Sequence, residues 1–257
     1  MIRVLLLLLL TITNAIAQPI TLRIVTEDFP PFQYVRNGKM EGPMYEIMQR
    51  VCKEASIDCF IEVKPWKDAL ESAENGYADV IFSVLLESDE HKDKFELSQP
   101  IVDTAYGFFT TIRNKWYFNS VEDLKGLKVG TYGPSGTSIV SEQLFKSYKS
   151  DMNRPYLYVE NTVPEALQNL IIGKYGKNGV VILNKDVGNY QLKLKRVVGL
   201  KFAGDIKHAS YGFGFSKKSQ HLAEVSRLTT ALSRLRQRGV IDSILREYDL
   251  SSSNFIK

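Results

Sequence analysis

The sequence has few cysteines and histidines and no concentrated block of charge. Two Cys and three His occur in 257 residues, and His91, His208 and His221 are scattered, so clustered zinc ligands are not predicted. Basic and acidic residues number 33 and 29, which gives a formal net charge of +4. No run of five or six like charges occurs, so nucleic-acid binding is not indicated.

Long apolar runs and common catalytic motifs are also missing after the first twenty residues. No later segment approaches 18 uninterrupted apolar residues, and no nucleophile elbow or phosphate-binding loop occurs. The chain instead has 44% hydrophobic and 24% charged residues, a composition typical of globular proteins. Its length permits one large unit or two lobes of roughly 100 residues each.

The N-terminus has the organisation of a secretory signal peptide. Arg3 precedes an apolar stretch over residues 4–12, and Ala15-Ile16-Ala17 forms a small-x-small cleavage signature before Gln18. The alternative is a membrane anchor, but this stretch is shorter than the roughly 20 residues that span a bilayer. We expect cleavage after Ala17, so that residues 1–17 are removed, and export to a bacterial periplasm. No cysteine at the cleavage point could accept a lipid.

Cys52 and Cys59 are separated by six residues that include the turn-like Ser56-Ile57-Asp58. In an oxidising compartment, a pair that joins a helix end to the next strand favours a disulfide. The alternative is two reduced, half-buried thiols.

Hydrophobic periodicity predicts two units of alternating strands and helices. In the first, strands are expected over 22–25, 59–63 and 79–84, with helices over 44–55 and 66–74. In the second, strands are expected over 128–131, 156–159 and 179–183, with helices over 138–148 and 163–172. This order predicts an α/β fold with largely parallel sheets.

Two β-rich stretches, 106–112 and 211–216, lie on either side of the second unit. We interpret them as two extended crossings between the lobes, after which helices over 219–236 and 240–248 return to the first lobe. Strand ends and helix N-termini of both lobes then converge on a cleft suited to ligand capture by hinge closure.

An ordered set of short motifs runs through nearly the whole chain. They are Pro30-Pro31-Phe32, Gly38 to Gly42, Pro65-Trp66, Ala69-Leu70, Gly76-Tyr77-Ala78-Asp79, Phe95-Glu96-Leu97-Ser98-Gln99-Pro100, Asp123-Leu124-Lys125-Gly126-Leu127-Lys128-Val129-Gly130, Gly239 and Ile244. In this order they resemble the family 3 periplasmic solute-binding proteins, the receptors of polar amino-acid ABC importers.

The resemblance implies a two-lobed type II periplasmic binding protein, a Venus flytrap with two extended hinge strands. Lobe 1 would comprise residues 18–110 and 207–257, and lobe 2 residues 111–206. The resemblance also implies a monomer without a cofactor, which binds a small-molecule ligand and meets an ABC permease or a membrane sensor.

In that family two aromatic residues sandwich the ligand, and their positions match Phe29 and Trp66 here. Both could instead be core aromatics. The family also holds an α-carboxylate with a hydroxyl and an Arg, whose positions are Leu86 and His91. The acidic residue that holds the α-ammonium falls on Asn184, with Asp186 as the competing alignment.

These departures bear on the ligand. A buried carboxylate needs strong compensation, and neither Leu86 nor a single-point contact from His91 replaces a bidentate Arg. A neutral hydrogen bond from Asn184 likewise replaces an ion pair. We therefore expect a ligand other than an ordinary α-amino acid bound in the usual manner: one that is less charged, aromatic or bound another way.

The alternative is that other groups compensate. Ser83, Ser88 and the helix-start amides around Thr137 in Gly136-Thr137-Ser138 are candidates.

Binding is favoured over catalysis because no complete catalytic motif occurs. An enzyme on the same fold, such as a cyclohexadienyl-dehydratase-like lyase, would need a positioned acid or base, for which His91, Asp186, Glu27 and Asp28 are candidates. A receptor for a membrane sensor would use the same binding chemistry with another partner.

Overall fold

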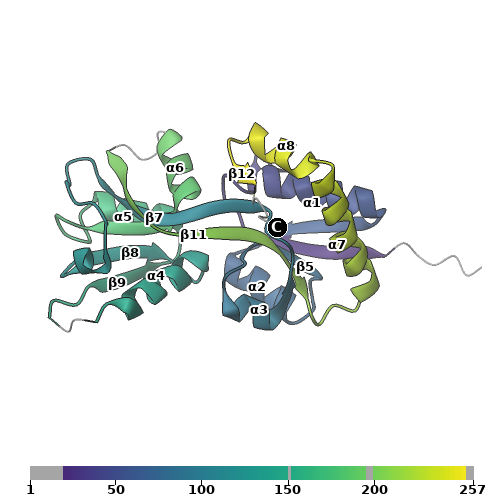
Figure 1. Cartoon of the computed structure of the whole chain (residues 1–257), viewed down its shortest axis with the longest axis horizontal. Helices are drawn as coiled ribbons and strands as arrows, with labels where there is room; N and C mark the ends of the chain where they lie inside the picture. Colours follow the sequence, from purple (N-terminus) through teal and green to yellow (C-terminus); the bar gives the residue numbers. More distant parts are fainter. Residues whose placement is uncertain (1–19, 150–151, 195–198, 253–257) are drawn as a thin grey trace, which may run out of the picture.

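The computed structural model describes residues 20–149, 152–194 and 199–252. Two lobes lie side by side and are joined by the long strands β7 (Val102–Thr111) and β11 (Leu200–Ser216) (Figure 1). The expected signal peptide lies outside the described residues. Across those residues, no helix combines the length and apolar character needed to cross a membrane.

Lobe 1 is the part of the structure around β1, β4 and β5. Its elements before β7 are β1 (Thr21–Thr26), β2 (Tyr34–Arg36), β3 (Lys39–Glu41), α1 (Pro43–Ala55), β4 (Asp58–Val63), α2 (Trp66–Glu74), β5 (Val80–Leu85), α3 (Asp89–Lys94) and β6 (Phe95–Leu97). After β11 the chain returns to this lobe with α7 (Leu222–Gln237), α8 (Val240–Glu247) and β12 (Ser251–Ser252).

Lobe 2 is the part around β8, β9 and β10. Its elements are the 3-10 helix η1 (Val121–Leu124), β8 (Lys128–Tyr132), α4 (Gly136–Ser147), β9 (Tyr156–Glu160), α5 (Val163–Ile171), β10 (Val180–Asn184) and α6 (Lys185–Lys193). The expected lobe boundaries, after residues 110 and 206, fall within β7 and β11.

One sheet passes through both lobes, with the strand order β4-β1-β5-β11-β7-β10-β8-β9. Strand β1 is parallel to β4 and β5, and β8 is parallel to β9 and β10. The β5–β11, β11–β7 and β7–β10 pairs are antiparallel. Each unit therefore contains parallel strands, as the α/β alternation predicted. The two units are joined through antiparallel strands.

Helix α1 shows how the sequence pattern positions lobe 1. Its apolar residues recur on one face and are buried; they are Met44, Ile47, Met48, Val51, Cys52 and Ala55. Pro43 starts the helix, where its missing N–H costs nothing, and Ser56 ends it in a left-handed conformation. Arg227 of α7 donates to the carbonyl of Ala55 at 2.6 Å, which ties the returning helix to α1.

The disulfide is confirmed. Cys52 of α1 and Cys59 of β4 are joined, with their Cα atoms 6.2 Å apart. The bond therefore links a helix end to the next strand, as the spacing predicted.

Several elements differ from the sequence prediction. Strand β11 begins at Leu200, whereas the sequence predicted a start at Tyr211. Its first half was missed because register shifts between Phe202 and Lys207 interrupt the alternation of buried and exposed residues. The β2–β3 hairpin, α3 and α6 were not predicted. Each is short, and α6 buries only Val187 and Gly188, so hydrophobic periodicity gives little signal.

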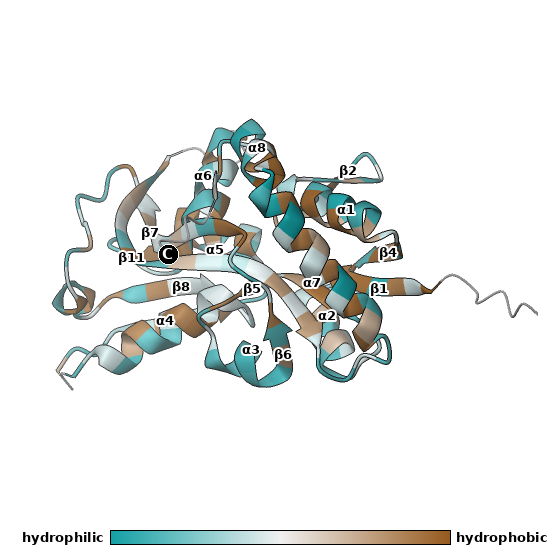
Figure 2. Cartoon of the chain, turned by 45° about the vertical axis from the view of Figure 1, so that its right-hand side comes forward, coloured by the Kyte–Doolittle hydropathy of each residue, from teal (hydrophilic) through white to brown (hydrophobic). Residues whose placement is uncertain are grey.

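The hydropathy of the elements agrees with their positions in the fold. Strand β1 is mainly hydrophobic, whereas hydrophilic residues predominate on α3 and along the visible side of α8 (Figure 2). Strand β5 is buried throughout, between β1 and β11. The ends of the buried strands therefore form a rigid base for the loops that meet between the lobes.

Candidate functional site

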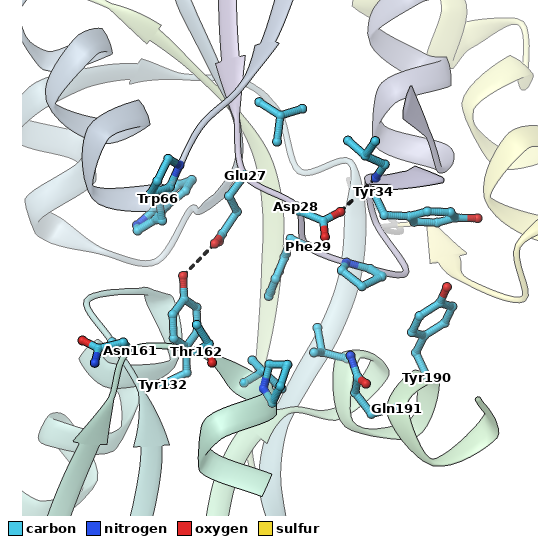
Figure 3. Close-up of a pocket in the computed structure, with 18 of the residues that line it drawn as sticks. Glu27, Asp28, Phe29, Tyr34, Trp66, Tyr132, Asn161, Thr162, Tyr190 and Gln191 are labelled. Carbon is cyan, nitrogen blue, oxygen red and sulfur yellow. Dashed lines mark hydrogen bonds between the residues drawn. The ribbon is translucent and has the colours of Figure 1, made fainter. Parts of the chain in front are cut away.

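A cavity of about 1020 Å³ lies between the two lobes. Lobe 1 contributes the loop after β1, the β2 strand and the β4–α2 junction, and lobe 2 contributes the loops after β8 and β9 together with α5 and α6 (Figure 3). Its wall consists of residues 27–30, 34–36, 63–67, 132–134 and 161–164, with Gln168, Ile171, Val187, Tyr190, Gln191 and Leu194. This volume is at the upper end of small-molecule sites.

The loop after β1 is held in a tight turn. The Phe29 amide donates to the carbonyl of Gln33 at 2.8 Å, and the Gln33 side chain donates to Thr26 Oγ1 at 3.0 Å. The Pro30-Pro31 bond is cis. These contacts fix the loop against the end of β1 and turn Glu27, Asp28 and Phe29 toward the cleft.

Phe29 and Trp66 both line the cavity. Phe29 packs on Phe32, with ring centroids 5.3 Å apart, and edge-on against Tyr211 at 5.9 Å. Trp66 is the first residue of α2 and follows Pro65. Each side chain is thus partly a core residue and partly a cavity wall, and the ligand sandwich expected from the sequence stays a prediction.

Glu27 lies between these two aromatic residues (Figure 3). Tyr132, at the end of β8 in lobe 2, donates its hydroxyl to Glu27 Oε2 at 2.6 Å, so the contact joins the two lobes. Burial raises the pKa of Glu27 to about 7, and the negative charge of Asp28 acts in the same direction, while the Tyr132 hydrogen bond opposes it.

A second contact between the lobes involves Tyr34 and Tyr190. Tyr34 belongs to the β2–β3 hairpin and Tyr190 to α6, and their ring centroids are 6.0 Å apart. The Arg36 guanidinium lies 5.0 Å from the Tyr34 ring centroid and 3.4 Å from Glu41. The cavity is therefore flanked by Glu27–Tyr132 on one side and by Tyr34–Tyr190 on the other.

Leu86 and His91, which the resemblance led us to expect at the carboxylate-binding positions, lie outside the cavity wall. Leu86 is partly buried against the cluster that contains Trp66, and His91 is 1% exposed. His91 lies behind Trp66, at 6.4 Å between ring centroids, with its Nδ1 2.9 Å from the Leu85 carbonyl oxygen. Burial lowers the pKa of His91, which disfavours a charged imidazole there.

Ser83, Ser88 and Thr137 also lie outside this wall. Ser83 donates to Gln33 Oε1 at 2.6 Å, and Ser88 Oγ accepts from the His91 amide at the start of α3. The Thr137 amide donates to Ser135 Oγ at 3.1 Å. Ser135 therefore caps α4 with its own side chain and already engages an amide considered for anion binding.

Asn184 is fully engaged in the scaffold. Its Nδ2 donates to Thr104 Oγ1 at 2.8 Å and to the Tyr211 hydroxyl at 3.3 Å. Its Oδ1 accepts from the amides of Asp186 and Val187 and so caps α6. Thr104 in turn donates to Asp186, whose pKa is raised by burial. Within this structure Asn184 has no hydrogen-bonding capacity left for a ligand.

Sequence reasoning missed Tyr132, Tyr34 and Tyr190, and it considered Glu27 only as a candidate catalytic acid or base. Their position in the sequence could have identified Glu27 and Tyr132. Both residues lie at the carboxyl ends of parallel strands, where ligand-binding groups gather in α/β proteins. In the part of the chain that the structure describes, no three His, Cys, Asp or Glu residues are grouped to hold a metal ion.

Two α/β lobes joined by two long strands, with a large cavity between them, define a two-lobed ligand-binding protein. Residues 22–251 match the bacterial extracellular solute-binding proteins, family 3, and the chain belongs to this family. The resemblance found in its motifs is confirmed.

Individual proteins agree with this assignment. The chain is 25% identical over 221 residues to the probable amino-acid-binding protein YxeM of Bacillus subtilis, covering 85% of this chain and 79% of that protein. Its fold is similar to a histidine kinase sensor domain with similarity to periplasmic binding proteins (TM-score 0.78, 18% identity, 91% and 99% covered). It is also similar to ArtJ, an arginine-, lysine-, histidine-binding protein of Geobacillus stearothermophilus (TM-score 0.75, 22% identity, 89% and 94% covered).

Proposed function

We propose that this protein captures a small polar or aromatic metabolite by closing its lobes and delivers it to an ABC importer. The observation that carries the proposal is the cavity of about 1020 Å³ bounded by loops of both lobes. Export to the periplasm, a monomeric state and docking to a membrane permease belong to the same proposal.

The residues of the cavity wall support the proposal that the ligand is amino-acid-like but is held differently from a standard α-amino acid. The family positions for a hydroxyl and an Arg carry Leu86 and His91, neither of which reaches the cavity. The expected ammonium position falls on Asn184, or on Asp186 in the competing alignment, and all hydrogen-bonding groups of the Asn184 side chain are used within the scaffold. Flat apolar surface from Phe29 and Trp66 remains, with Glu27 between them.

A thermal-shift screen of the purified protein against amino acids, aromatic acids and heterocycles tests this function. A ligand at about 100 times its dissociation constant stabilises the folded state by about 2.7 kcal/mol, which raises the melting temperature by several degrees. We expect a hit whose shift is lost in Trp66→Leu. The matched control is Trp116→Leu, which changes the other tryptophan, away from the cavity wall. A screen of this breadth without a hit would contradict the proposal.

Catalysis is the second candidate, and one observation favours it. Glu27 has a pKa near neutral pH in the wall of the cavity between the lobes, as a general acid requires. Each hit from the screen is therefore followed by NMR for conversion to product. A stable ligand supports binding alone, and turnover that is lost in Glu27→Gln would show an enzyme.

A further inference from the structure

Glu27 has an unusual position for an acidic side chain. Its carboxyl projects into the space between Trp66 and Phe29 and meets the Tyr132 hydroxyl of the opposite lobe (Figure 3). Oε2 accepts that hydrogen bond at 2.6 Å. Oε1 receives no hydrogen bond from the described residues and is the oxygen left for a ligand.

The cationic side chains of the same cavity do not neutralise Glu27. Lys64, Lys67 and Arg36 contribute to the wall, but no ion pair joins any of them to Glu27 within the described residues. Lys64 pairs with Glu62 at 3.0 Å, and Arg36 pairs with Glu41 at 3.4 Å.

The remaining titratable groups around Glu27 are acidic or phenolic. Asp28 follows it in the loop, and Tyr132 faces it from β8. Tyr106 of β7 and Tyr211 of β11 lie behind the loop; burial first, and the Glu27 charge in addition, raises the pKa of both, so they stay neutral. A negative charge on Glu27 is thus opposed by burial and by Asp28, and supported by one phenolic hydrogen bond.

A carboxylate in this position loses much of its hydration when the lobes close. One neutral hydrogen bond does not replace that hydration, whereas a carboxylic acid has far less to lose. The free energy of closure is therefore lower when Glu27 carries a proton.

We propose that Glu27 takes up a proton when the cleft closes, so that the site binds its ligand through a neutral carboxylic acid. Such an acid keeps the Tyr132 hydrogen bond on one oxygen and donates its own O–H from the other. The group it recognises is an uncharged acceptor, such as an amide carbonyl or a heteroaromatic nitrogen, on a flat ligand between Trp66 and Phe29. This inference rests on the proposed binding function.

The direction of the pH dependence follows. In the structure, where Tyr132 contacts Glu27 from the opposite lobe, the Glu27 pKa is about 7, against 4.5 for an ordinary Glu carboxyl. We expect an open cleft, which exposes Glu27 to water, to bring the pKa toward that ordinary value. Between these values the closed form holds the proton and the open form releases it. Closure around a neutral ligand is therefore favoured as pH falls through 7, by at most about tenfold in affinity per pH unit. A cationic ligand at Glu27 would show the opposite trend.

Infrared difference spectroscopy on the protein closed around a compound found in the thermal-shift screen tests the proton directly. The spectrum of the protein minus that of Glu27→Gln should show the carbonyl band of a protonated carboxyl at pH 6, lost with a midpoint near pH 7. Glu62→Gln removes a solvent-exposed carboxyl and should give no such band at pH 6. A Glu27 band that disappears near pH 4.5 would overturn the proposal. A ligand that binds and closes the cleft without a protonated Glu27 band at pH 6 would overturn this inference alone and leave the proposed function standing.

A matched pair of planar probes tests the selectivity. Benzamide presents a neutral carbonyl, and benzamidine presents a cationic amidinium of nearly the same shape. At pH 6 we expect benzamide to raise the melting temperature more than benzamidine does, with the difference reduced in Glu27→Gln. Equal shifts, or a larger shift with benzamidine, would overturn the selectivity.

Discussion

The side chain of Asn184 donates to Thr104 Oγ1 at 2.8 Å and thereby fastens the start of α6 to the long strand β7. The same side chain caps α6 through two backbone amides. Since α6 carries Tyr190 and Gln191 into the cavity wall, this contact helps to set the shape of the site. Asn184, one of the two residues expected from the sequence at the ammonium-binding position, with Asp186 as the other, serves here to hold the scaffold.

Asn184→Ala should lower the free energy of unfolding by about 2 kcal/mol, because it removes a helix cap and a buried hydrogen bond. Urea denaturation followed by circular dichroism measures this. Asn75→Ala is the control, since Asn75 makes one exposed hydrogen bond at the end of α2 and should change stability by less than about 0.5 kcal/mol. Equal effects of the two substitutions would contradict the assigned role.

Removal of the disulfide should destabilise lobe 1. The bond between Cys52 and Cys59 closes a short loop, for which the chain-entropy account gives about 2 to 3 kcal/mol. The double variant Cys52→Ala, Cys59→Ala should therefore melt several degrees lower than the oxidised protein. Reduction of the native protein should reproduce most of this change, and an unchanged melting temperature would show that the bond adds no stability.

The ionisation of Glu27 should make the protein less stable at neutral pH than at mildly acidic pH. An acid whose folded pKa is raised from 4.5 to about 7 holds its proton longer when folded, so its contribution is lost as pH rises through this range. Glu27→Gln should therefore gain stability relative to the native protein as pH rises from about 4.5 to about 7, by at most on the order of 3 kcal/mol, and the difference should stay level above that range. A pH-independent difference between the two proteins would contradict the raised pKa.

The α/β architecture could be predicted from the sequence because the spacing of apolar residues in long amphipathic elements indicates which face is buried. Met44 and Ile47 of α1 recur at helical spacing, and both are buried. The start of β11 could not be predicted, because its register shifts interrupt the alternation that identifies a strand.

The candidate site was only partly predictable. Phe29 and Trp66 were found because they follow recognisable motifs, and both line the cavity. Tyr132 was missed because it is the last residue of β8 and no local sequence motif marks it as a site residue. Its hydrogen-bond partner Glu27 lies 105 residues away in the sequence. Contacts between lobes depend on how two separate units are oriented, and hydrophobic periodicity within one unit does not encode that orientation.

Electron paramagnetic resonance distances across the cleft test the central claim, ligand-induced closure, most directly. Asp68→Cys in α2 and Ile172→Cys after α5 place spin labels on opposite lobes at exposed positions, and the native cysteines are joined as a disulfide. We predict that the compound found in the thermal screen shortens and narrows the distance distribution, and that Trp66→Leu abolishes this response. A distribution that stays unchanged at saturating ligand would contradict capture by closure.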